Sequence, residues 1–359
     1  MDNGKKDEKW IGADCKLLHY MGRIDFTDEK NPIWIYPCTC VRIRFTGNYI
    51  KASVTNIRAY WTNYLGIILD DVESKVQLKN EGKQEFVLGE NLGDGEHELL
   101  FFKRMDSCHM IQFHGFAVER NAEVLPLQEI PRRRIEVYGD SVSAGEVSEA
   151  VAYTGLPDPV HDGAYSNSYY SYAWILARKL NAQIHDIAQG GAALLNGTGY
   201  FHAPDYLGME YIYDKMQYHS DIAEVKQWDF SKYTPHLVVI AIGQNDNYPE
   251  DYMTNDYMGE KAICWRNRYF ELIQKLRRNY PKAIIILTTT ILNHSEAWDF
   301  AIEDVCTRLN DKKIYHFLYS NNGRGTQGHI RIPEAERMAE ELYTFINALG
   351  EAVWEEEVL

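Results

Sequence analysis

The segment that most restricts the fold of this chain is 237–242, which reads LVVIAI. A strand with no polar position has no face that suits water, so other elements must cover both of its faces. Similar apolar strands are predicted at 135–138, 182–187, 283–287 and 313–319, with helices near 260–279 and 295–309. Strands that alternate with helices indicate a mostly parallel sheet between two layers of helices.

The first 130 residues have a different periodicity. Apolar Val41, Ile43 and Phe45 alternate with polar residues, and Gly, Asn and Asp clusters separate this run from the next. Further runs with a period of two lie at 49–54, 64–69, 97–102 and 110–118. Short strands at this spacing predict an antiparallel sandwich. We therefore expect two domains, a jelly-roll-like β-sandwich over 1–130 and an α/β/α domain over 131–350, followed by an acidic tail over 351–359.

Charge and hydropathy narrow the classes of partner. The 359 residues carry a formal net charge of -15 and no block rich in Lys or Arg, which argues against nucleic acid and against anionic membranes. No apolar run approaches the roughly 20 residues that cross a bilayer, and MDNGKKDEKW at the start lacks the apolar core of a signal peptide. A cytoplasmic protein is expected, although a secreted form trimmed of its signal would begin in the same way. The six scattered cysteines are expected to be reduced thiols, and the sequence predicts no metal and no other cofactor.

The first predicted strand of the second half ends in YGDSVSAG, residues 138–145. A serine on a tight turn between a strand and a helix holds its hydroxyl at the edge of the sheet, so Ser141 suits a nucleophile. A Gly-Asp-Ser turn that only caps a helix explains the same residues equally well. The motif is not the Gly-x-Ser-x-Gly turn of the α/β-hydrolases, because Ser143 takes the place of its last glycine.

Three further signals follow along the chain. Gly190 and Gly191 end the second predicted strand, where a backbone N–H can approach an oxyanion, and Asn245 follows the third strand. His329 lies just before the last predicted helix. Each signal alone is explained by a turn or by an inert loop residue. Together they place Ser, Gly, Asn and His in order at the edge of the sheet where ligands collect in open α/β folds.

The order of these blocks resembles that of the SGNH/GDSL hydrolases. The matching residues are Gly139-Asp140-Ser141, Gly190-Gly191, Gly243-Gln244-Asn245-Asp246 and His329. In the first half, residues 22–50 and 97–119 look like the sandwich strands of carbohydrate esterase family 2, whose members are acetyl esterases that join such a sandwich to an SGNH domain. The resemblance implies a flavodoxin-like catalytic domain that works without a metal.

The resemblance also implies a role for each block. Ser141 would attack the acyl carbon, and His329 would take its proton, so that an acyl-enzyme forms and water then hydrolyses it. The backbone N–H groups of Ser141 and Gly191, together with the side chain of Asn245, would hold the oxyanion. Gly190 is the alternative to Gly191, because the sequence leaves the register of the paired glycines open.

The chain departs from the SGNH pattern just before its histidine. Most SGNH enzymes carry an aspartate two or three residues earlier, where this sequence has Gln327 and Thr326. The resemblance to family 2 members that lack this aspartate predicts a Ser-His dyad, in which a main-chain carbonyl orients the ring of His329. Asp162 and Asp246 are the alternative, more distant carboxylates.

The resemblance implies an acetylated oligo- or polysaccharide, such as xylan or glucomannan, as the substrate. The chain has 25 Tyr and 8 Trp, which suit stacking on sugar rings and suit core packing as well. The candidate substrate-binding residues are Tyr200, Phe201, Trp265 and Asp246, and the sandwich loop at 60–66 is expected to close over the cleft.

Two other functions stay open from the sequence. The first is a lipase-like or thioesterase SGNH hydrolase, which would need an apolar channel for a long acyl chain. The second is a carbohydrate-binding protein with a weakened or inactive site, a reading that the missing aspartate permits. A homo-oligomer is also compatible with the sequence.

Overall fold

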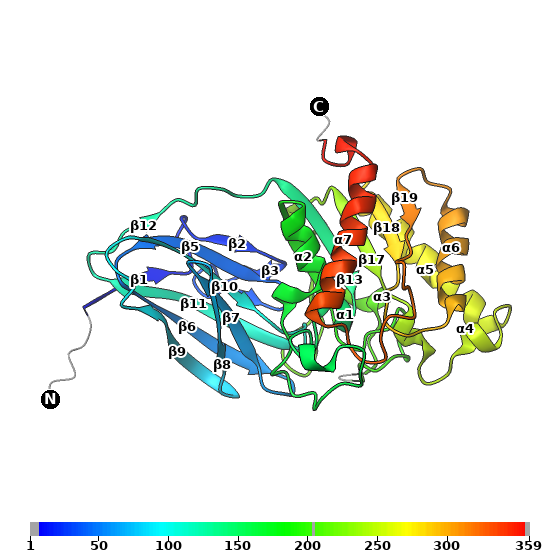
Figure 1. The fold of residues 1–359 in the computed structure, drawn as a ribbon, viewed down its shortest axis with the longest axis horizontal. Helices are drawn as coiled ribbons and strands as arrows, with labels where there is room; N and C mark the ends of the chain where they lie inside the picture. The colour runs from blue at the N-terminus through cyan, green and yellow to red at the C-terminus, as the bar shows by residue number, and fades with distance from the viewer. Residues whose placement is uncertain (1–6, 203–204, 356–359) are drawn as a thin grey trace.

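A computed structural model describes residues 7–202 and 205–355 of the chain (Figure 1). Antiparallel sheets occupy the N-terminal end of the molecule, and a parallel sheet with helices on both faces occupies the other end. The strands of the antiparallel part are β1 (Glu8–Gly12), β2 (His19–Met21), β3 (Ile24–Asp25), β4 (Ile33–Trp34), β5 (Cys40–Thr46), β6 (Tyr49–Arg58), β7 (Tyr64–Leu69), β8 (Val72–Gln77), β9 (Glu81–Glu90), β10 (Glu96–Lys103), β11 (His109–Glu119) and β12 (Val124–Leu125).

The antiparallel strands form two packed sheets, as the period of two predicts. One sheet has the order β3-β4-β11-β6-β9 with β1 paired to β11, and the other has the order β12-β5-β10-β7-β8 with β2 paired to β5. On β5, Val41, Ile43 and Phe45 are buried in the core between the sheets, while Arg42 and Arg44 face outward. Strands β8 and β9 were not predicted from the sequence. Strand β8 is exposed along most of its length, so it shows no apolar face that a period of two could reveal.

The parallel sheet begins at β13. Its five strands are β13 (Arg133–Gly139), β14 (Ala182–Ala188), β17 (Leu237–Ala241), β18 (Ile284–Thr288) and β19 (Ile314–His316), and a separate small hairpin joins β15 (Lys215–Gln217) to β16 (Lys226–Gln227). The order β14-β13-β17-β18-β19 is 2-1-3-4-5 along the chain, which is the flavodoxin-like order. All four pairings are parallel, which confirms the predicted sheet.

The helices cover both faces of this sheet. They are α1 (Ser141–Ala144), α2 (Tyr172–Lys179), α3 (Met209–Ile212), α4 (Tyr252–Asn255), α5 (Glu260–Asn279), α6 (Glu296–Leu309) and α7 (Ile332–Ala348). Short 3-10 helices are η1 (Val151–Tyr153), η2 (Ser168–Tyr170), η3 (Phe230–Lys232), η4 (Gln244–Asn247) and η5 (Glu351–Val353).

The packing of β17 explains its sequence. Val238 and Ile240 belong to the core cluster of α5 and α6, and Val239 and Ala241 belong to the cluster of α2 and α7. All four side chains are fully buried. An apolar residue is therefore needed at every position, which is why this strand lacks the alternation seen in the sandwich.

The two halves of the chain share a buried junction. The Arg23 guanidinium, from the sandwich, donates to the carbonyl oxygens of Tyr213 and Lys215 at 2.8 and 2.9 Å and lies 3.5 Å from Glu136 Oε1. Both charged side chains are fully buried. Tyr36 of the sandwich also packs in the same apolar cluster as α5 and α6. The sandwich is thus anchored against the parallel sheet through charge pairing as well as apolar packing.

Two ends of elements differ from the predictions. Strand β19 stops at His316, short of the predicted 319. The described part of the predicted acidic tail is only partly solvated, because Val353 is buried and Arg133 lies 4.7 Å from the Trp354 ring. Residues 356–359 of that tail lie outside the described residues.

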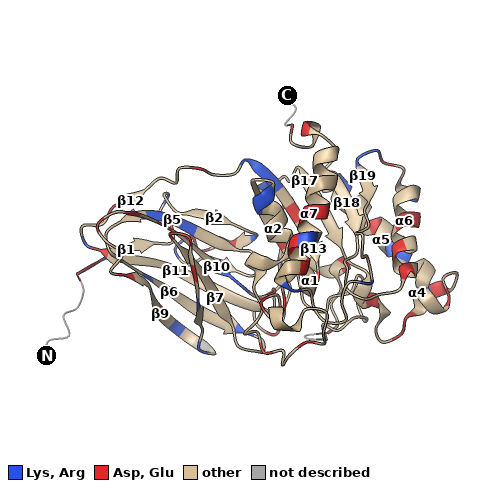
Figure 2. Cartoon of the chain, viewed as in Figure 1, with Lys and Arg blue, Asp and Glu red and all other residues tan. Residues whose placement is uncertain are grey.

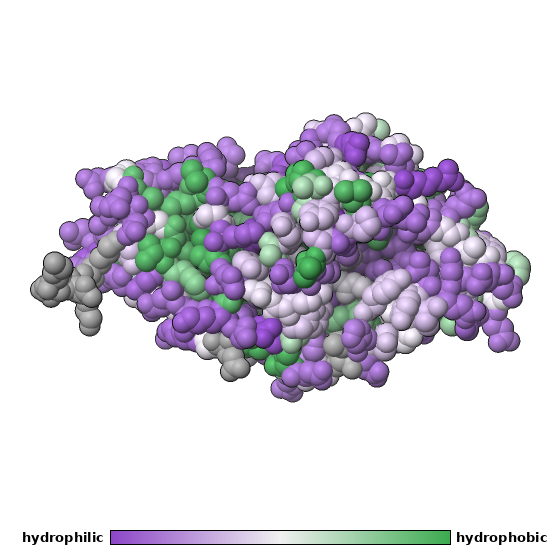
Figure 3. Space-filling view, turned by 60° about the horizontal axis from the view of Figure 1, so that its bottom comes forward, coloured by the Kyte–Doolittle hydropathy of each residue, from purple (hydrophilic) through white to green (hydrophobic). Residues whose placement is uncertain are grey.

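The surface is mixed in charge and mostly hydrophilic. Figure 2 shows acidic side chains along the outer helices α5, α6 and α7, and a compact basic group at the start of β13. Figure 3 shows a largely hydrophilic face with an apolar patch toward the sandwich end. Among the described residues, no helix combines the length and the apolar character that crossing a membrane requires.

Candidate active site

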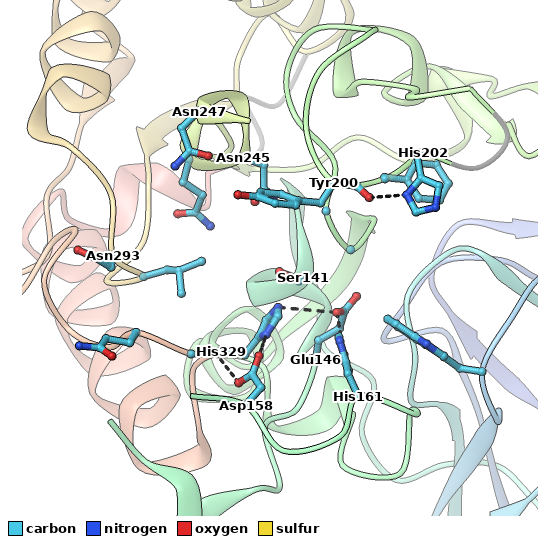
Figure 4. A pocket seen from close by; sticks show the side chains of 18 of the residues that line it. Ser141, Glu146, Asp158, His161, Tyr200, His202, Asn245, Asn247, Asn293 and His329 are labelled. Atoms are coloured by element: carbon cyan, nitrogen blue, oxygen red, sulfur yellow. Dashed lines mark hydrogen bonds and ion pairs between the residues drawn. The ribbon is translucent and has the colours of Figure 1, made fainter. Parts of the chain in front are cut away.

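A pocket of about 740 Å³ opens at the carboxyl ends of the parallel strands. Ser141 follows β13, Gly190 and Gly191 follow β14, and Asn245 follows β17. These residues and His329 all line this one pocket, and Figure 4 shows Ser141 between His329 on one side and Asn245 on the other. The structure therefore brings together the residues that the sequence pattern singled out.

Ser141 is the first residue of α1, directly after β13. The Asp140 side chain caps this helix, since its Oδ1 accepts from Val142 N at 3.0 Å. A Cβ atom on Gly139 would lie 2.0 Å from Ser143 Oγ, so only glycine fits at that turn. The turn both caps a helix and presents the hydroxyl of Ser141, which is 4% exposed, to the pocket. The interpretation of the motif as a helix cap and its interpretation as a nucleophile turn are thus compatible.

The paired glycines are not equivalent. Gly190 N donates to Asp106 Oδ2 at 3.1 Å, which occupies its only hydrogen. Gly191 has a φ of 72°, a left-handed conformation that favours glycine, and its N–H meets no acceptor among the described residues. The N–H of Ser141 likewise meets no acceptor among the described residues. Geometry therefore favours Gly191 over Gly190 as the oxyanion donor.

Asn245 lies on η4 at the edge of the pocket. Its Nδ2 donates to Asp140 Oδ2 at 3.0 Å and to the Ala192 carbonyl at 3.1 Å. Gln244 donates to the same oxygen of Asp140 at 2.7 Å, while burial raises the pKa of Asp140 to about 6. Both hydrogens of the Asn245 amide are thus engaged, and a bond to an oxyanion requires one of them to change partner.

A carboxylate orients the ring of His329. Asp158 Oδ2 lies 2.5 Å from His329 Nδ1, and Asp158 Oδ1 accepts from the backbone N–H of His329 at 2.9 Å and from Arg331 Nη2 at 2.6 Å. Burial alone would raise the pKa of Asp158, but the bonds and charges of His329 and Arg331 outweigh it and hold that pKa well below its ordinary value. The predicted main-chain carbonyl is therefore wrong, because a charged acceptor occupies this position.

The two distant carboxylates that the sequence offered do not reach the ring. Asp162 accepts from Ala164 N within its own loop, at 3.0 Å. Asp246 is buried and accepts from Leu194 N at 2.8 Å and Leu195 N at 3.2 Å. The contact between Asp158 and His329 was not predicted, because 171 residues separate the two in the chain. The loop around Asp158, TGLPDPVHDG, contains acidic side chains but no motif that links one of them to His329.

Of the four predicted substrate-binding residues, two line the pocket and two do not. Tyr200 is 52% exposed there and stacks on Tyr248 with ring centroids 4.5 Å apart, while Phe201 is mostly buried beside it. Trp265 is fully buried and stacks on Tyr269 in the core, because it lies on the inner face of α5. Asp246 holds backbone N–H groups instead, so substrate contacts by Trp265 and Asp246 are wrong in this arrangement.

The sandwich also contributes to the pocket. Tyr60 and Trp61, from the loop after β6, line the wall, as expected for the 60–66 loop. Trp61 packs against the ring of His161, with centroids 4.2 Å apart.

A second histidine–carboxylate pair lies beside the first and was not predicted. Glu146 Oε2 is 3.2 Å from His161 Nε2 and 3.8 Å from His329 Nε2 (Figure 4). Glu146 is buried, and this burial raises its pKa. Burial alone would lower the pKa of His161, but Glu146 outweighs it and raises that pKa. Among the described residues, no hydrogen bond joins Ser141 to the His329 ring.

Comparison with known proteins agrees with the sandwich. Residues 20–127 match the family described as carbohydrate esterase 2 N-terminal. Over 357 residues, 96% of its length, the chain is 32% identical to cellulase/esterase CelE of Acetivibrio thermocellus. The chain is thus similar to the family 2 carbohydrate esterases over nearly its whole length. It spans only 41% of the length of that relative.

Two more relatives extend this similarity. The chain is 25% identical to the acetylxylan esterase / glucomannan deacetylase of Cellvibrio japonicus, over 92% of its own length and 88% of that protein. A solved family 2 esterase from Clostridium thermocellum, in complex with cellohexaose, superposes with a TM-score of 0.77 at 28% identity, covering 92% of this chain and 98% of that one.

Proposed function

We propose that this chain is a serine esterase that removes O-acetyl groups from carbohydrates. The observation that carries the proposal is the carboxylate on His329 Nδ1 in the pocket that also holds Ser141 and the free N–H of Gly191. A nucleophile, an oriented base and an oxyanion donor are what acyl transfer requires. The relatives named as esterases support the same reaction class.

Acylation begins with the hydroxyl of Ser141. His329 Nε2 takes its proton as Oγ attacks the acyl carbon, and Asp158 keeps the other ring proton on Nδ1 and stabilises the imidazolium. The imidazolium then protonates the leaving sugar oxygen, and an acetyl-Ser141 ester remains. Water attacks this ester with His329 again as base, which releases acetate and restores the serine.

Two backbone donors hold the negative charge that develops on the acyl oxygen. They are the N–H groups of Ser141 and Gly191, which have no other acceptor among the described residues. Asn245 supplies a third donor when its bond to Ala192 or Asp140 changes partner. Donors placed before the reaction stabilise the transition state most effectively, because they need not reorganise while it forms.

The walls of the pocket favour a sugar as the leaving group. Exposed Tyr200 and the ring of Trp61 offer flat aromatic surfaces on which a pyranose ring can stack. The relatives support this substrate class, since one is named for acetylxylan and glucomannan and another was solved with cellohexaose.

The alternatives predict different behaviour. A lipase-like or thioesterase enzyme would prefer long acyl chains, so faster release of p-nitrophenol from the octanoate than from the acetate ester would favour it. A binding protein with an inactive site was suggested by the missing aspartate, and Asp158 removes that reason because the base has its carboxylate partner.

The decisive test is acetate release from acetylated xylan, acetylated glucomannan and their short oligosaccharides. The wild-type chain should release acetate from at least one of these substrates, and Ser141→Ala should release none above background. Equal and negligible release by both proteins across the panel would reject deacetylation of these carbohydrates.

A further inference from the structure

A cluster of three potential metal ligands lies behind the glycine block, at the start of β11. Asp106, Cys108 and His109 each offer one ligand atom, and these atoms all lie within 4.8 Å of one another. Each of the three side chains is at most 1% exposed. Cys108 Sγ lies only 2.8 Å from Asp106 Oδ1, which is short for a contact between sulfur and oxygen. The cluster is separate from the Ser141 and His329 pair.

The ring of His109 is the unusual member of this cluster. It is fully buried, and neither Nδ1 nor Nε2 has a hydrogen-bond partner among the described residues. A neutral imidazole carries one N–H and one lone pair, and leaving both buried and unpaired is unfavourable. The nearest aromatic neighbour, Tyr60, meets this ring edge-on with centroids 5.5 Å apart, which offers the nitrogens no acceptor. A metal ion would give one nitrogen the partner it lacks.

We propose that Asp106, Cys108 and His109 bind a divalent transition-metal ion of the zinc class. Thiolate, imidazole and carboxylate are the ligands that zinc takes in proteins. Ligands that each lie about 2.0–2.3 Å from one ion are about 3.5 Å apart in a tetrahedral site. Side-chain shifts of about 1 Å therefore suffice to convert the observed spacing into coordination.

A second buried histidine lies on the same side of the molecule. His219 is 2% exposed, and neither of its ring nitrogens has a hydrogen-bond partner among the described residues. The residue before it, Tyr218, is hydrogen-bonded through its hydroxyl to Ser107 Oγ at 2.5 Å, and Ser107 lies between Asp106 and Cys108 in the chain. His219 is therefore the candidate for a fourth protein ligand, reached by a movement of its own side chain.

One neighbouring charge opposes a cation. The ammonium of Lys103 is buried in the same region, but it donates to the carbonyl oxygens of Met105 and Asp106 and leaves the ligand atoms free. On binding, the Cys108 thiol releases its proton to solvent, so that a thiolate and a carboxylate together offset the two positive charges of the ion. Lys103 then holds the loop that carries the ligands.

The cluster is connected to the pocket through one side chain. Asp106 Oδ2 accepts from Gly190 N at 3.1 Å and from Gln189 Nε2 at 2.8 Å, while Oδ1 faces Cys108. A metal on Oδ1 would therefore fix the backbone just before Gly191. The ion would therefore be structural, because it would tie a sandwich loop to the glycine block. This role does not depend on which reaction takes place in the pocket.

The test uses the full chain without an affinity tag, stripped with a chelator and then dialysed against Zn²⁺ or Co²⁺. We expect about one equivalent of metal per chain after gel filtration, and with Co²⁺ a thiolate-to-metal charge-transfer band in the near ultraviolet. Cys108→Ala should abolish that band, and Cys108→Ala and His109→Ala should each weaken binding by at least about tenfold. Ser141→Ala should bind as the wild type does, so the result is independent of esterase activity.

The chain offers a matched control. Cys38 is also buried and also faces a carboxylate, with its Sγ 3.4 Å from Asp186 Oδ2, but no histidine within the described part of the chain completes a ligand cluster there. Cys38→Ala should keep the full metal content and the cobalt band. Failure of the folded wild-type chain to retain either ion would overturn the proposal even if the variants prove unstable. Equal loss in Cys38→Ala and Cys108→Ala would also overturn it.

Discussion

The sandwich and the parallel sheet reach the same pocket in different ways. The parallel sheet delivers its groups at strand ends, so that Ser141, Gly191 and Asn245 meet because three neighbouring strands stop at one edge. The sandwich delivers Tyr60 and Trp61 from a loop, and these residues form a wall. Strand ends position reacting atoms closely, whereas loops shape the space around them. Changes in the sheet should therefore affect turnover, and changes in the sandwich loop should affect binding.

The junction between the two regions supports this division. Arg23 and Glu136 are buried between them, and apolar residues of both regions pack in one cluster. A loop that stands on such a junction keeps a constant distance from the sheet edge. The wall should therefore be preformed, and its contribution to binding should be measurable one residue at a time.

The largest effect is expected for Ser141→Ala. Without the nucleophile, kcat for acetate release should fall by about 10⁵-fold or more, as in other serine hydrolases. Binding of the oligosaccharide, measured by calorimetry, should persist, because the hydroxyl is a small part of the pocket. An unchanged turnover would mean that the reaction does not take place at this edge of the sheet.

Asp158→Asn tests the base. The amide cannot hold the Nδ1 proton as the carboxylate does, so kcat should fall by about 10²- to 10⁴-fold. The melting temperature should also fall, because the buried guanidinium of Arg331 loses its charged partner. Asp162→Asn is the matched control, since this exposed carboxylate of the same loop bonds only Ala164 among the described residues. Activity of Asp158→Asn within twofold of the wild type would mean that Ser141 and His329 work as a dyad without a carboxylate.

Asn245→Ala should lower kcat by about 10²-fold, because one donor is lost and Asp140 loses one of its hydrogen bonds. The control is Asn247→Ala, which removes another pocket-lining amide from the same short helix and should change kcat by only a few fold. Equal losses in the two variants would mean that Asn245 acts only through the shape of the helix.

Trp61→Ala tests the contribution of the sandwich. We expect KM for an acetylated oligosaccharide to rise by about tenfold, roughly 1.4 kcal/mol, with little change in kcat. Hydrolysis of p-nitrophenyl acetate, which has no sugar, should be nearly unaffected. Trp10→Ala, at an exposed position on β1, serves as the control and should leave both parameters unchanged. A fall in kcat without a rise in KM would contradict the proposed division between wall and chemistry.

The smallest effect concerns stability against pH. Burial raises the pKa of Asp140 to about 6 and that of Asp246 to about 7, above the 3.8 expected when unfolded. The folded chain therefore holds more protons than the unfolded chain between about pH 4 and 7, and the stability from these groups is lost as pH rises through that window. Urea unfolding should show a free energy of unfolding lower at pH 8 than at pH 5, on the order of 4 kcal/mol.

One variant of the parallel sheet and one residue of the sandwich test the origin of this pH dependence. Asp246→Asn should flatten the dependence between pH 5 and 8, because the amide cannot ionise. In the sandwich, burial alone would raise the pKa of Asp25, but hydrogen bonds from Lys226 and Thr27 outweigh it and lower that pKa. Its stabilisation is present above the unfolded pKa and is lost only in acid, as pH falls through the folded pKa. A stability that rises from pH 5 to pH 8 would contradict the assignment to buried carboxyls of the parallel sheet.

The sequence by itself determined the strands of the parallel sheet, the two long helices after β17 and the order of the candidate site residues. The unbroken apolar run 237–242 requires cover on both faces, and the helix predicted near 260–279 is observed as Glu260–Asn279. Ser141, Gly191, Asn245 and His329 could be chosen because turn chemistry after a strand is local and leaves a readable motif. The division into two domains at residue 130 stays a prediction.

Only the tertiary structure decided which side chains support these groups. Asp158 reaches His329 across 171 residues, and Asp106 comes from the sandwich to occupy Gly190 and leave Gly191 free. The same folding turned Trp265 into the core and away from the pocket. Local sequence sets the conformation of a turn, but contacts between distant segments depend on how sheets and loops pack. No motif around His329 could therefore identify its carboxylate partner.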